Sequence, residues 1–351
     1  MNALPSLVDT EPSRLPQPYL LFLGDTTELA YAKTALGLCD WAGDRCVGEW
    51  SCGATVTTGL PELAPEEAYA RGARGLVIGV ANPGGFIPEA WIEPLIAALE
   101  AGLDIVSGMH MRLADLPALN AAARRLGRRL IDIRTPPPAI TIASGKKRSG
   151  KRLLTVGTDC ALGKKYTALA LARAMASRGV AVDFRATGQT GILIAGGGIP
   201  LDAVIADFEA GAAEMLSPNA APAHWDVIEG QGSLFHPAYA GVSLGLLHGS
   251  QPDVFVVCHE PGRMHVLGHP EFPLPSIKEV IDLTVQLGRL TNHDIRCAGV
   301  SMNTTRMDAA AAHELCARSS QTLELPVADP IRGGESFDRL VDAVLEERAQ
   351  S

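Results

Sequence analysis

The 351-residue sequence lacks several features that would place it in a class at once. It contains no apolar run long enough to span a membrane, and its first 18 residues hold no apolar core of signal-peptide length. Its seven cysteines form no CxxC pair, and a scattered set of this kind is typical of reduced thiols. The net charge of −9 argues against general binding of nucleic acid or of a membrane surface. We therefore expect a cytoplasmic protein with neither kind of partner.

Both halves of the sequence alternate apolar runs with helical patterns, which predicts parallel sheets covered by helices. A proline-rich and then polar run from Thr135 to Arg152 separates the halves. The predicted organisation is an N-terminal extension over residues 1–18, a Rossmann-like domain over 19–138, a linker over 139–151 and a second α/β domain over 152–351.

The apolar pattern also gives the expected elements. In the first domain the expected strands are 19–24, 75–80, 104–108 and 129–134, and the expected helices are 27–38, 88–102 and 116–127. In the second domain the expected strands are 152–157, 181–187, 225–230, 253–260 and 296–303, and the expected helices are 164–177, 201–216 and 276–290, with two terminal helical segments flanking 325–329. No GxGxxG motif follows the first strand, which argues against a dehydrogenase or epimerase.

The stretch VGTDCALGKKYTALALARAM, residues 156–175, has the order of a phosphate-binding loop: strand, glycine turn, lysine, helix. It departs from the usual pattern twice. Five residues rather than four separate Gly157 from Gly163, and Lys165 stands where Ser or Thr normally binds Mg²⁺. Because paired lysines neutralise phosphate without a metal, we expect a phosphate that is held but not transferred, and we do not expect Mg²⁺.

Two other strand ends carry candidate residues. Glu229 ends one predicted strand, where phosphate-loop proteins commonly place an acid that reaches the metal or its water. Asn303 ends another strand, and its amide offers a donor and an acceptor to an adenine edge. The structural alternatives are a hydrogen-bond acceptor for Glu229 and a turn residue for Asn303.

Longer runs carry a resemblance to known families. GTDxxxGK followed by EGxG resembles the ATP site of dethiobiotin synthetase and its relatives, which place Thr after the lysine. The runs GTDCALGK, FRATGQTGILIAGGGIPLDAV, IEGQGSLFHPAYAGVSLGLLHGSQPD and CHEPGR together resemble a two-domain family that includes the DgcN-type D-glutamate N-acetyltransferases. This resemblance covers nearly the whole chain.

The resemblance implies an α/β fold with an N-terminal Rossmann-like parallel-sheet domain and a C-terminal P-loop NTPase-like parallel-sheet domain. It also implies transfer of the acetyl group of acetyl-CoA to the amine of D-glutamate or a related D-amino acid. The product would then pass to a partner, an N-acetyl-D-amino-acid racemase. A homo-oligomer is also expected, because sheet domains with many apolar loops often self-associate.

Acetyl transfer needs a base, oxyanion donors and an aligned thioester. The candidate bases are Glu229, His236 and His259. The candidates for binding the amino acid are Arg185, Gln189, Arg263 and Arg112, since arginine forks suit a dicarboxylate. The candidates for binding the phosphates and adenosine are Gly157, Thr158, Asp159, Cys160, Gly163, Lys164, Lys165 and Asn303.

Several alternatives stay open at this point. Cys160, at a helix N-terminus beside lysine, is expected to have a lowered pKa and to be able to accept the acetyl group, or else it is a small residue that fits the loop. The spacing of His259, His265 and His269 does not predict a metal site. The rival functions are an ATP- and Mg²⁺-dependent ligase or kinase and a non-catalytic nucleotide-binding regulator.

Overall fold

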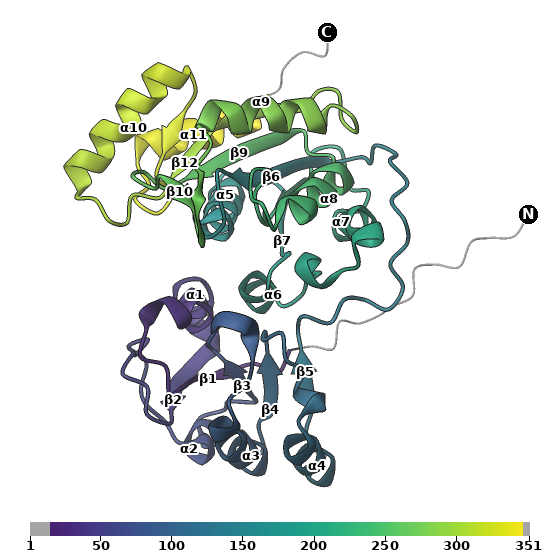
Figure 1. The fold of residues 1–351 in the computed structure, drawn as a ribbon, viewed down its shortest axis with the longest axis vertical. Coiled ribbons are helices and arrows are strands. Elements are labelled where there is room, and N and C mark those ends of the chain that lie inside the picture. Colours follow the sequence, from purple (N-terminus) through teal and green to yellow (C-terminus); the bar gives the residue numbers. More distant parts are fainter. Residues whose placement is uncertain (1–14, 347–351) are drawn as a thin grey trace, which may run out of the picture. The chain divides into compact units, whose positions relative to one another are not determined.

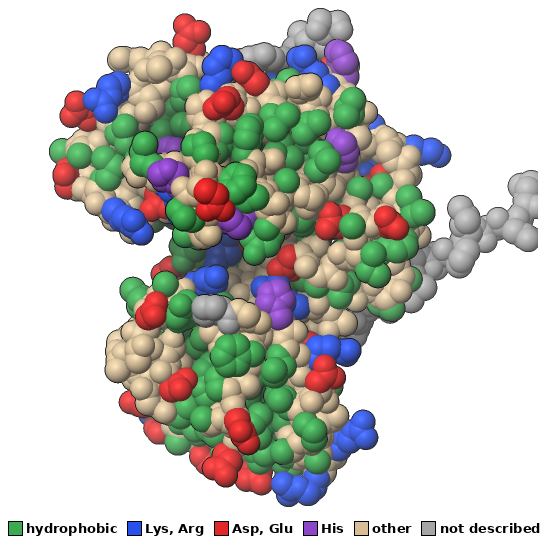
Figure 2. Space-filling view, in the orientation of Figure 1, with side chains coloured by type: hydrophobic (Ala, Val, Ile, Leu, Met, Phe, Trp, Pro, Cys, Tyr) green, Lys and Arg blue, Asp and Glu red, His purple; other side chains and the backbone are tan. Residues whose placement is uncertain are grey.

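The computed structural model describes residues 15–346, without the side chain of Pro83. The chain divides into two compact units (Figure 1). The first unit ends at Thr135 and includes Ile192–Gly197, and the second unit comprises the rest. On the visible face of each unit, acidic and basic side chains are interspersed among apolar ones (Figure 2).

Within the described part of the first unit, five parallel strands form a sheet in the order β2-β1-β3-β4-β5. The strands are β1 (Tyr19–Gly24), β2 (Cys46–Ser51), β3 (Gly75–Ile78), β4 (Asp104–Ser107) and β5 (Leu130–Asp132). The helices are α1 (Lys33–Ala42), α2 (Pro65–Ala70), α3 (Ile92–Glu100) and α4 (Pro117–Leu126). The predicted strands and helices are therefore present, but β2 and α2 were not predicted.

The core of this unit explains why the buried strands were the predictable ones. All six residues of β1 are buried, and Phe22 packs edge-on against Trp91 with ring centroids 5.4 Å apart. β2 lies at the sheet edge, and only Gly48 and Glu49 of its six residues are buried. It therefore lacks the continuous apolar run that marks a central parallel strand. The predicted helix 27–38 begins later, since a 3₁₀ turn at Leu29–Tyr31 precedes α1.

Within the described part of the second unit, six parallel strands form a sheet in the order β13-β12-β9-β6-β8-β7. The strands are β6 (Lys151–Gly157), β7 (Val182–Arg185), β8 (Trp225–Ile228), β9 (Val254–His259), β12 (Arg296–Met302) and β13 (Val327–Ala328). The helices are α5 (Lys164–Ser177), α7 (Glu209–Leu216), α8 (Ala240–Ser250), α9 (Ile277–Gly288), α10 (Ala309–Leu323) and α11 (Glu335–Leu345). The helix α6 (Gln189–Ala195) begins in this unit, and its residues from Ile192 onward belong to the first unit. Because the strands are parallel, the carboxyl ends of β6, β8, β9 and β12 meet at one edge of the sheet.

Several elements of this unit differ from expectation. The predicted helix 201–216 is two 3₁₀ turns followed by the shorter α7. The helices α6 and α8 were not predicted. An antiparallel hairpin of β10 (His265–Val266) and β11 (His269–Pro273) was also not predicted.

The polar run expected to be a linker is hydrogen-bonded to the second unit. The backbone N–H groups of Ser144 and Gly145 donate to the carboxylate of Glu214. Arg148 Nε donates to Ser217 O at 2.7 Å, and Arg152 is fully buried. This segment is therefore packed along the second domain. Among residues 15–346, no helix combines the length and apolar character that crossing a membrane requires.

Candidate phosphate-binding site

The phosphate loop joins the end of β6 at Gly157 to the start of α5 at Lys164. Ala161 and Gly163 both have left-handed backbone, with φ of 54° and 100°. These two bends turn the chain so that Lys164 Nζ reaches back and donates to Asp159 O at 2.7 Å. A Cβ added at Gly157 would lie 3.3 Å from that ammonium, so glycine leaves room for the lysine.

The loop presents donors suited to an anion. Within the described residues, the backbone N–H groups of Ala161, Leu162 and Gly163 donate to no protein acceptor. They precede α5, whose N-terminal dipole adds positive potential at the same place. Burial lowers the pKa of Lys164, although the neighbouring Cys160 and Asp159 raise it. A bound phosphate would stabilise the charged form of this buried lysine.

Asp159 joins the phosphate loop to the segment that follows β9 by hydrogen bonds. Its side chain is fully buried, and its Oδ2 atom accepts from Arg263 Nη1 at 2.9 Å and from Leu267 N at 2.8 Å. Arg263 Nη1 also donates to Cys160 O at 2.8 Å, and Nη2 donates to Glu260. Both ends of this guanidinium fork are therefore used within the protein.

Thr158, Asp159 and Thr167 offer side-chain oxygen atoms in place of the missing hydroxyl, and all three are engaged in hydrogen bonds. Thr158 Oγ1 lies 3.1 Å from His259 Nδ1, and Thr167 Oγ1 lies 2.7 Å from Ser301 Oγ. Asp159 accepts the hydrogen bonds just described. With an ammonium at position 165 as well, these residues do not fit the Mg²⁺ site of a typical phosphate loop.

Glu229 follows β8 and is anchored by the segment after β7. Its Oε2 atom accepts from the backbone N–H groups of Thr187 and Gly188, both at 3.0 Å, and Thr187 Oγ1 donates to Glu229 O at 2.7 Å. Burial raises the pKa of Glu229, while the charge of Lys165 and the two N–H donors lower it. The strand-end rule that selected Glu229 would also have selected Thr187, which the sequence analysis missed.

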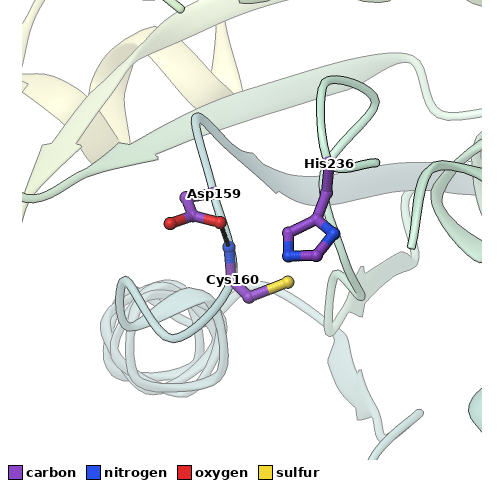
Figure 3. Close-up of side chains that lie close together, drawn as sticks. All are labelled: Asp159, Cys160 and His236. Carbon is purple, nitrogen blue, oxygen red and sulfur yellow. Dashed lines mark hydrogen bonds between the residues drawn. The ribbon is translucent and has the colours of Figure 1, made fainter. Parts of the chain in front are cut away.

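Cys160 and His236 point toward one another beside the loop (Figure 3). One ligand-type atom from each of Asp159, Cys160 and His236 lies within 4.8 Å of the other two. Burial raises the pKa of the Cys160 thiol, and the opposing effects of Lys164 and Arg263 are smaller. The expected lowering of this pKa is therefore wrong, because the helix terminus and the lysine do not compensate for desolvation.

The other two strand-end candidates are held by local hydrogen bonds. Burial lowers the pKa of His259, as does the charge of Arg263, and its Nδ1 atom faces the Thr158 hydroxyl. Asn303 Oδ1 accepts from Thr305 Oγ1 at 2.7 Å, a local hydrogen bond typical of a turn residue. Asn303 N donates to His259 O at 2.8 Å, so the two strand ends are joined.

The candidates for amino-acid binding fall in different places. Arg185 ends β7 and donates to Asp226 Oδ1 at 2.7 Å and to Asp183 Oδ2 at 3.0 Å. Gln189 begins α6, directly after the Gly188 N–H group that holds Glu229. Arg112 is an exposed residue of the first unit, between β4 and a 3₁₀ turn. Gln189 therefore directly follows Gly188, one of the two residues whose N–H groups hold the Glu229 carboxylate. Arg185 instead forms ion pairs with Asp183 and Asp226.

Comparison with known proteins confirms the predicted fold class, a Rossmann-like domain followed by a P-loop domain. A family model described as a domain of unknown function, DUF1611_C P-loop domain, matches residues 141–341. A second, described as DUF1611_N Rossmann-like domain, matches residues 44–136. A crystal structure of a DUF1611 family protein from Anabaena variabilis is 35% identical, with a TM-score of 0.83, and the match covers 93% of this chain and 99% of that one.

Two curated relatives cover most of the sequence. A Pseudoalteromonas protein named D-glutamate N-acetyltransferase is 50% identical over 90% of this chain and 96% of its own length. A Tritonibacter scottomollicae protein of the same name is 50% identical over 93% of this chain and 98% of its own length. The two-domain resemblance found in the sequence is thereby confirmed, and the chain belongs to the DUF1611 family.

Proposed function

We propose that this chain is a D-glutamate N-acetyltransferase, which moves the acetyl group of acetyl-CoA to the amine of D-glutamate or a related D-amino acid. The observation that carries this proposal is the 50% identity to two relatives of that name, over nearly their whole lengths. Both domains are included in the match, so the similarity is not that of a shared phosphate loop alone.

The phosphate loop is the proposed site for the phosphates of acetyl-CoA. The N–H groups of residues 161–163, the buried Lys164 and the adjacent Lys165 supply the positive potential. These phosphates are bound but never transferred, so the reaction needs no metal bridging them. The engaged Thr158, Asp159 and Thr167 side chains agree with such a role.

Glu229 is the proposed base. A base is needed because the substrate arrives as an ammonium ion and only the neutral amine attacks. One proton passes to the carboxylate, the nitrogen lone pair forms the new C–N bond, and the thioester carbonyl becomes a tetrahedral oxyanion. The nitrogen of this species still carries two hydrogens and a positive charge. When the oxyanion collapses, the C–S bond breaks and the departing thiolate of CoA takes one of these protons, which leaves the amide and the free thiol. Holding Oε2 on two N–H groups leaves Oε1 to accept the proton.

Substrate recognition is proposed to involve Gln189, which adjoins the Gly188 anchor of Glu229. Arg263 is assigned to positioning the loop, since Asp159, Cys160 and Glu260 already accept its hydrogen bonds. Arg185 is left out of the proposal because of its two ion pairs. Four expectations from the sequence stay predictions. They are that Arg112 binds the amino acid, that a racemase is the partner, that the chain forms a homo-oligomer and that it is cytoplasmic.

The experiment is release of free thiol from acetyl-CoA, compared between D-glutamate and L-glutamate, with and without EDTA. The expected result is D-selective release that EDTA does not change. No release with either isomer would overturn the proposal. Loss of ATP that requires Mg²⁺ and a carboxylic or amine substrate would instead support the ligase or kinase alternative. Nucleotide binding without turnover of any amine would support the regulator.

A further inference from the structure

His236 is fixed in one orientation by its own turn. Its side chain is 2% exposed, and its Nδ1 atom accepts hydrogen bonds from Ala238 N at 3.1 Å and Tyr239 N at 3.3 Å. The Tyr239 ring packs on one face with centroids 4.5 Å apart, and the His269 ring meets it edge-on at 5.2 Å. Neither the position nor the rotation of this imidazole is free to change.

These contacts determine which ring nitrogen carries the proton. A backbone N–H can only donate, so Nδ1 must present its lone pair to Ala238 and Tyr239. A neutral imidazole has one N–H, and it must then be at Nε2. Burial lowers the pKa of His236, as do His269 and Lys164, against the opposing effect of Asp159. The ring is accordingly neutral near pH 7 and has no lone pair at Nε2 with which to take a proton or bind a metal.

Nε2 faces the phosphate loop. In Figure 3 the ring nitrogen remote from Cβ is directed at the Cys160 sulfur. Cys160 directly precedes the three loop residues whose N–H groups have no protein acceptor. The backbone of Leu267 raises the pKa of His236, and since Nδ1 already accepts two N–H groups, the carbonyl of Leu267 faces the Nε2 side of the ring. A phosphate oxygen is a charged acceptor and forms a stronger hydrogen bond than a neutral carbonyl.

We infer that His236 is a hydrogen-bond donor, through Nε2, to a phosphate group held by the loop, and not the base of the reaction. This inference rests on the proposed function, because it takes the phosphates to be those of acetyl-CoA. It assigns to the segment after β8 a direct part in recognising a phosphoanhydride, alongside the backbone of the loop and Lys164.

Two substitutions separate the roles of the two ring nitrogens. His236→Asn keeps an acceptor near the Nδ1 position for the Ala238 and Tyr239 N–H groups, but has no donor at the Nε2 position. His236→Gln keeps a donor near Nε2 and loses the acceptor near Nδ1. His293→Gln is the matched control, because the His293 side chain is 90% exposed. Thermal unfolding of each variant checks that it is folded.

Calorimetric titration with CoA is the first measurement. His236→Asn is expected to weaken CoA binding about tenfold to hundredfold, the effect of losing one hydrogen bond to a charged group. His236→Gln is expected to stay within a few-fold of wild type, and His293→Gln is expected to be unchanged. Equal affinity of the wild type and His236→Asn would overturn the inference, as would a folded His236→Gln that binds as weakly as His236→Asn.

The tautomer itself is measured by ¹⁵N NMR of histidine-labelled protein, with His236 assigned by the signal missing in His236→Asn. A proton on Nε2 is expected at pH 7.5, and a proton on Nδ1 would overturn the inference. This measurement does not depend on enzymatic activity. If the wild-type protein binds no CoA, the proposed function loses its donor site, and inorganic pyrophosphate then serves as the probe. Failure to bind pyrophosphate as well would overturn the assigned phosphate acceptor.

Discussion

Arg263 Nη1 lies 2.9 Å from Asp159 Oδ2, and this ion pair joins the phosphate loop to the segment that follows β9. The Asp159 side chain is fully buried, and that of Arg263 is 16% exposed. The N–H group of Leu267, in the hairpin turn, donates to the same carboxylate oxygen. The shape of the loop and the position of the hairpin therefore depend on one charged pair that is largely withdrawn from water.

Replacing Arg263 by alanine should be strongly destabilising. The substitution leaves the Asp159 carboxylate buried without its charge partner, so the free energy of unfolding should fall by about 3–5 kcal/mol. Urea unfolding measures this loss. Arg306→Ala is the control, because Arg306 is 89% exposed and lies 3.6 Å from Glu260. Its expected cost is less than about 1 kcal/mol. Similar losses in the two variants would show that the Asp159 pair does not hold the loop.

Replacing Lys165 by threonine should restore the missing hydroxyl of the loop. CoA binding should weaken about fivefold with the loss of one partly exposed charge near phosphate. Binding of ATP should become stronger when Mg²⁺ is added, because the hydroxyl supplies a ligand that the wild-type loop lacks. Calorimetry with CoA and with ATP, with and without Mg²⁺, tests both effects.

Lys165→Ala is the matched variant for this test, since it loses the charge without gaining a hydroxyl. It should share the weaker CoA binding and show no dependence of ATP binding on Mg²⁺. Unchanged CoA affinity in both variants would mean that Lys165 does not contact the phosphates.

The sequence predicted those helices and strands whose own residues carry a clear apolar or helical pattern. Central strands such as β1 and β9 are nearly continuous apolar runs, and α5 starts directly after the loop glycine. The helix α8 was missed because its sequence, AGVSLGLLHGS, contains three glycines, which disfavour helices. Helix packing explains the presence of at least one of these glycines. A Cβ at Gly249 would lie 2.1 Å from Ala210 O in α7, so glycine permits the close contact of the two helices.

The site was predictable to the same extent. The phosphate loop is local in sequence, so its glycines and lysine were found together. The ion-pair partner of each group lies far along the chain, as Arg263 does for Asp159 and Asp226 for Arg185. Likewise, the tautomer of His236 depends on two backbone N–H groups that no residue pattern reveals.

Glu229 gives the proposed reaction a defined pH dependence. A base must be deprotonated to act, and burial raises the pKa of Glu229 above its ordinary value of 4.5. The rate constant kcat should therefore fall as the pH is lowered through this raised pKa. Glu229→Gln should lower kcat about 10²- to 10⁴-fold at neutral pH and leave CoA binding nearly unchanged. Initial rates across pH 5–9 on the wild type and the variant test this. An active Glu229→Gln enzyme with an unaltered profile would exclude Glu229 as the base.

Gly191 provides a test of the position of Glu229 without changing its chemistry. A Cβ added at Gly191 would lie 2.2 Å from Glu229 Oε2, the atom that accepts from Thr187 and Gly188. Gly191→Ala should therefore displace the carboxylate, cost about 1–3 kcal/mol of stability and lower kcat toward the value of Glu229→Gln.

Gly241→Ala is the control for this substitution, because nothing lies within 4 Å of an added Cβ there. Gly241 is in α8, where alanine should add roughly 0.5–1 kcal/mol of stability and leave kcat unchanged. Measuring kcat and the free energy of unfolding for both variants separates displacement of Glu229 from a general effect of the substitution. If Gly191→Ala is destabilised yet keeps wild-type kcat, the position of the carboxylate does not matter to the chemistry, and Glu229 serves the fold rather than the reaction.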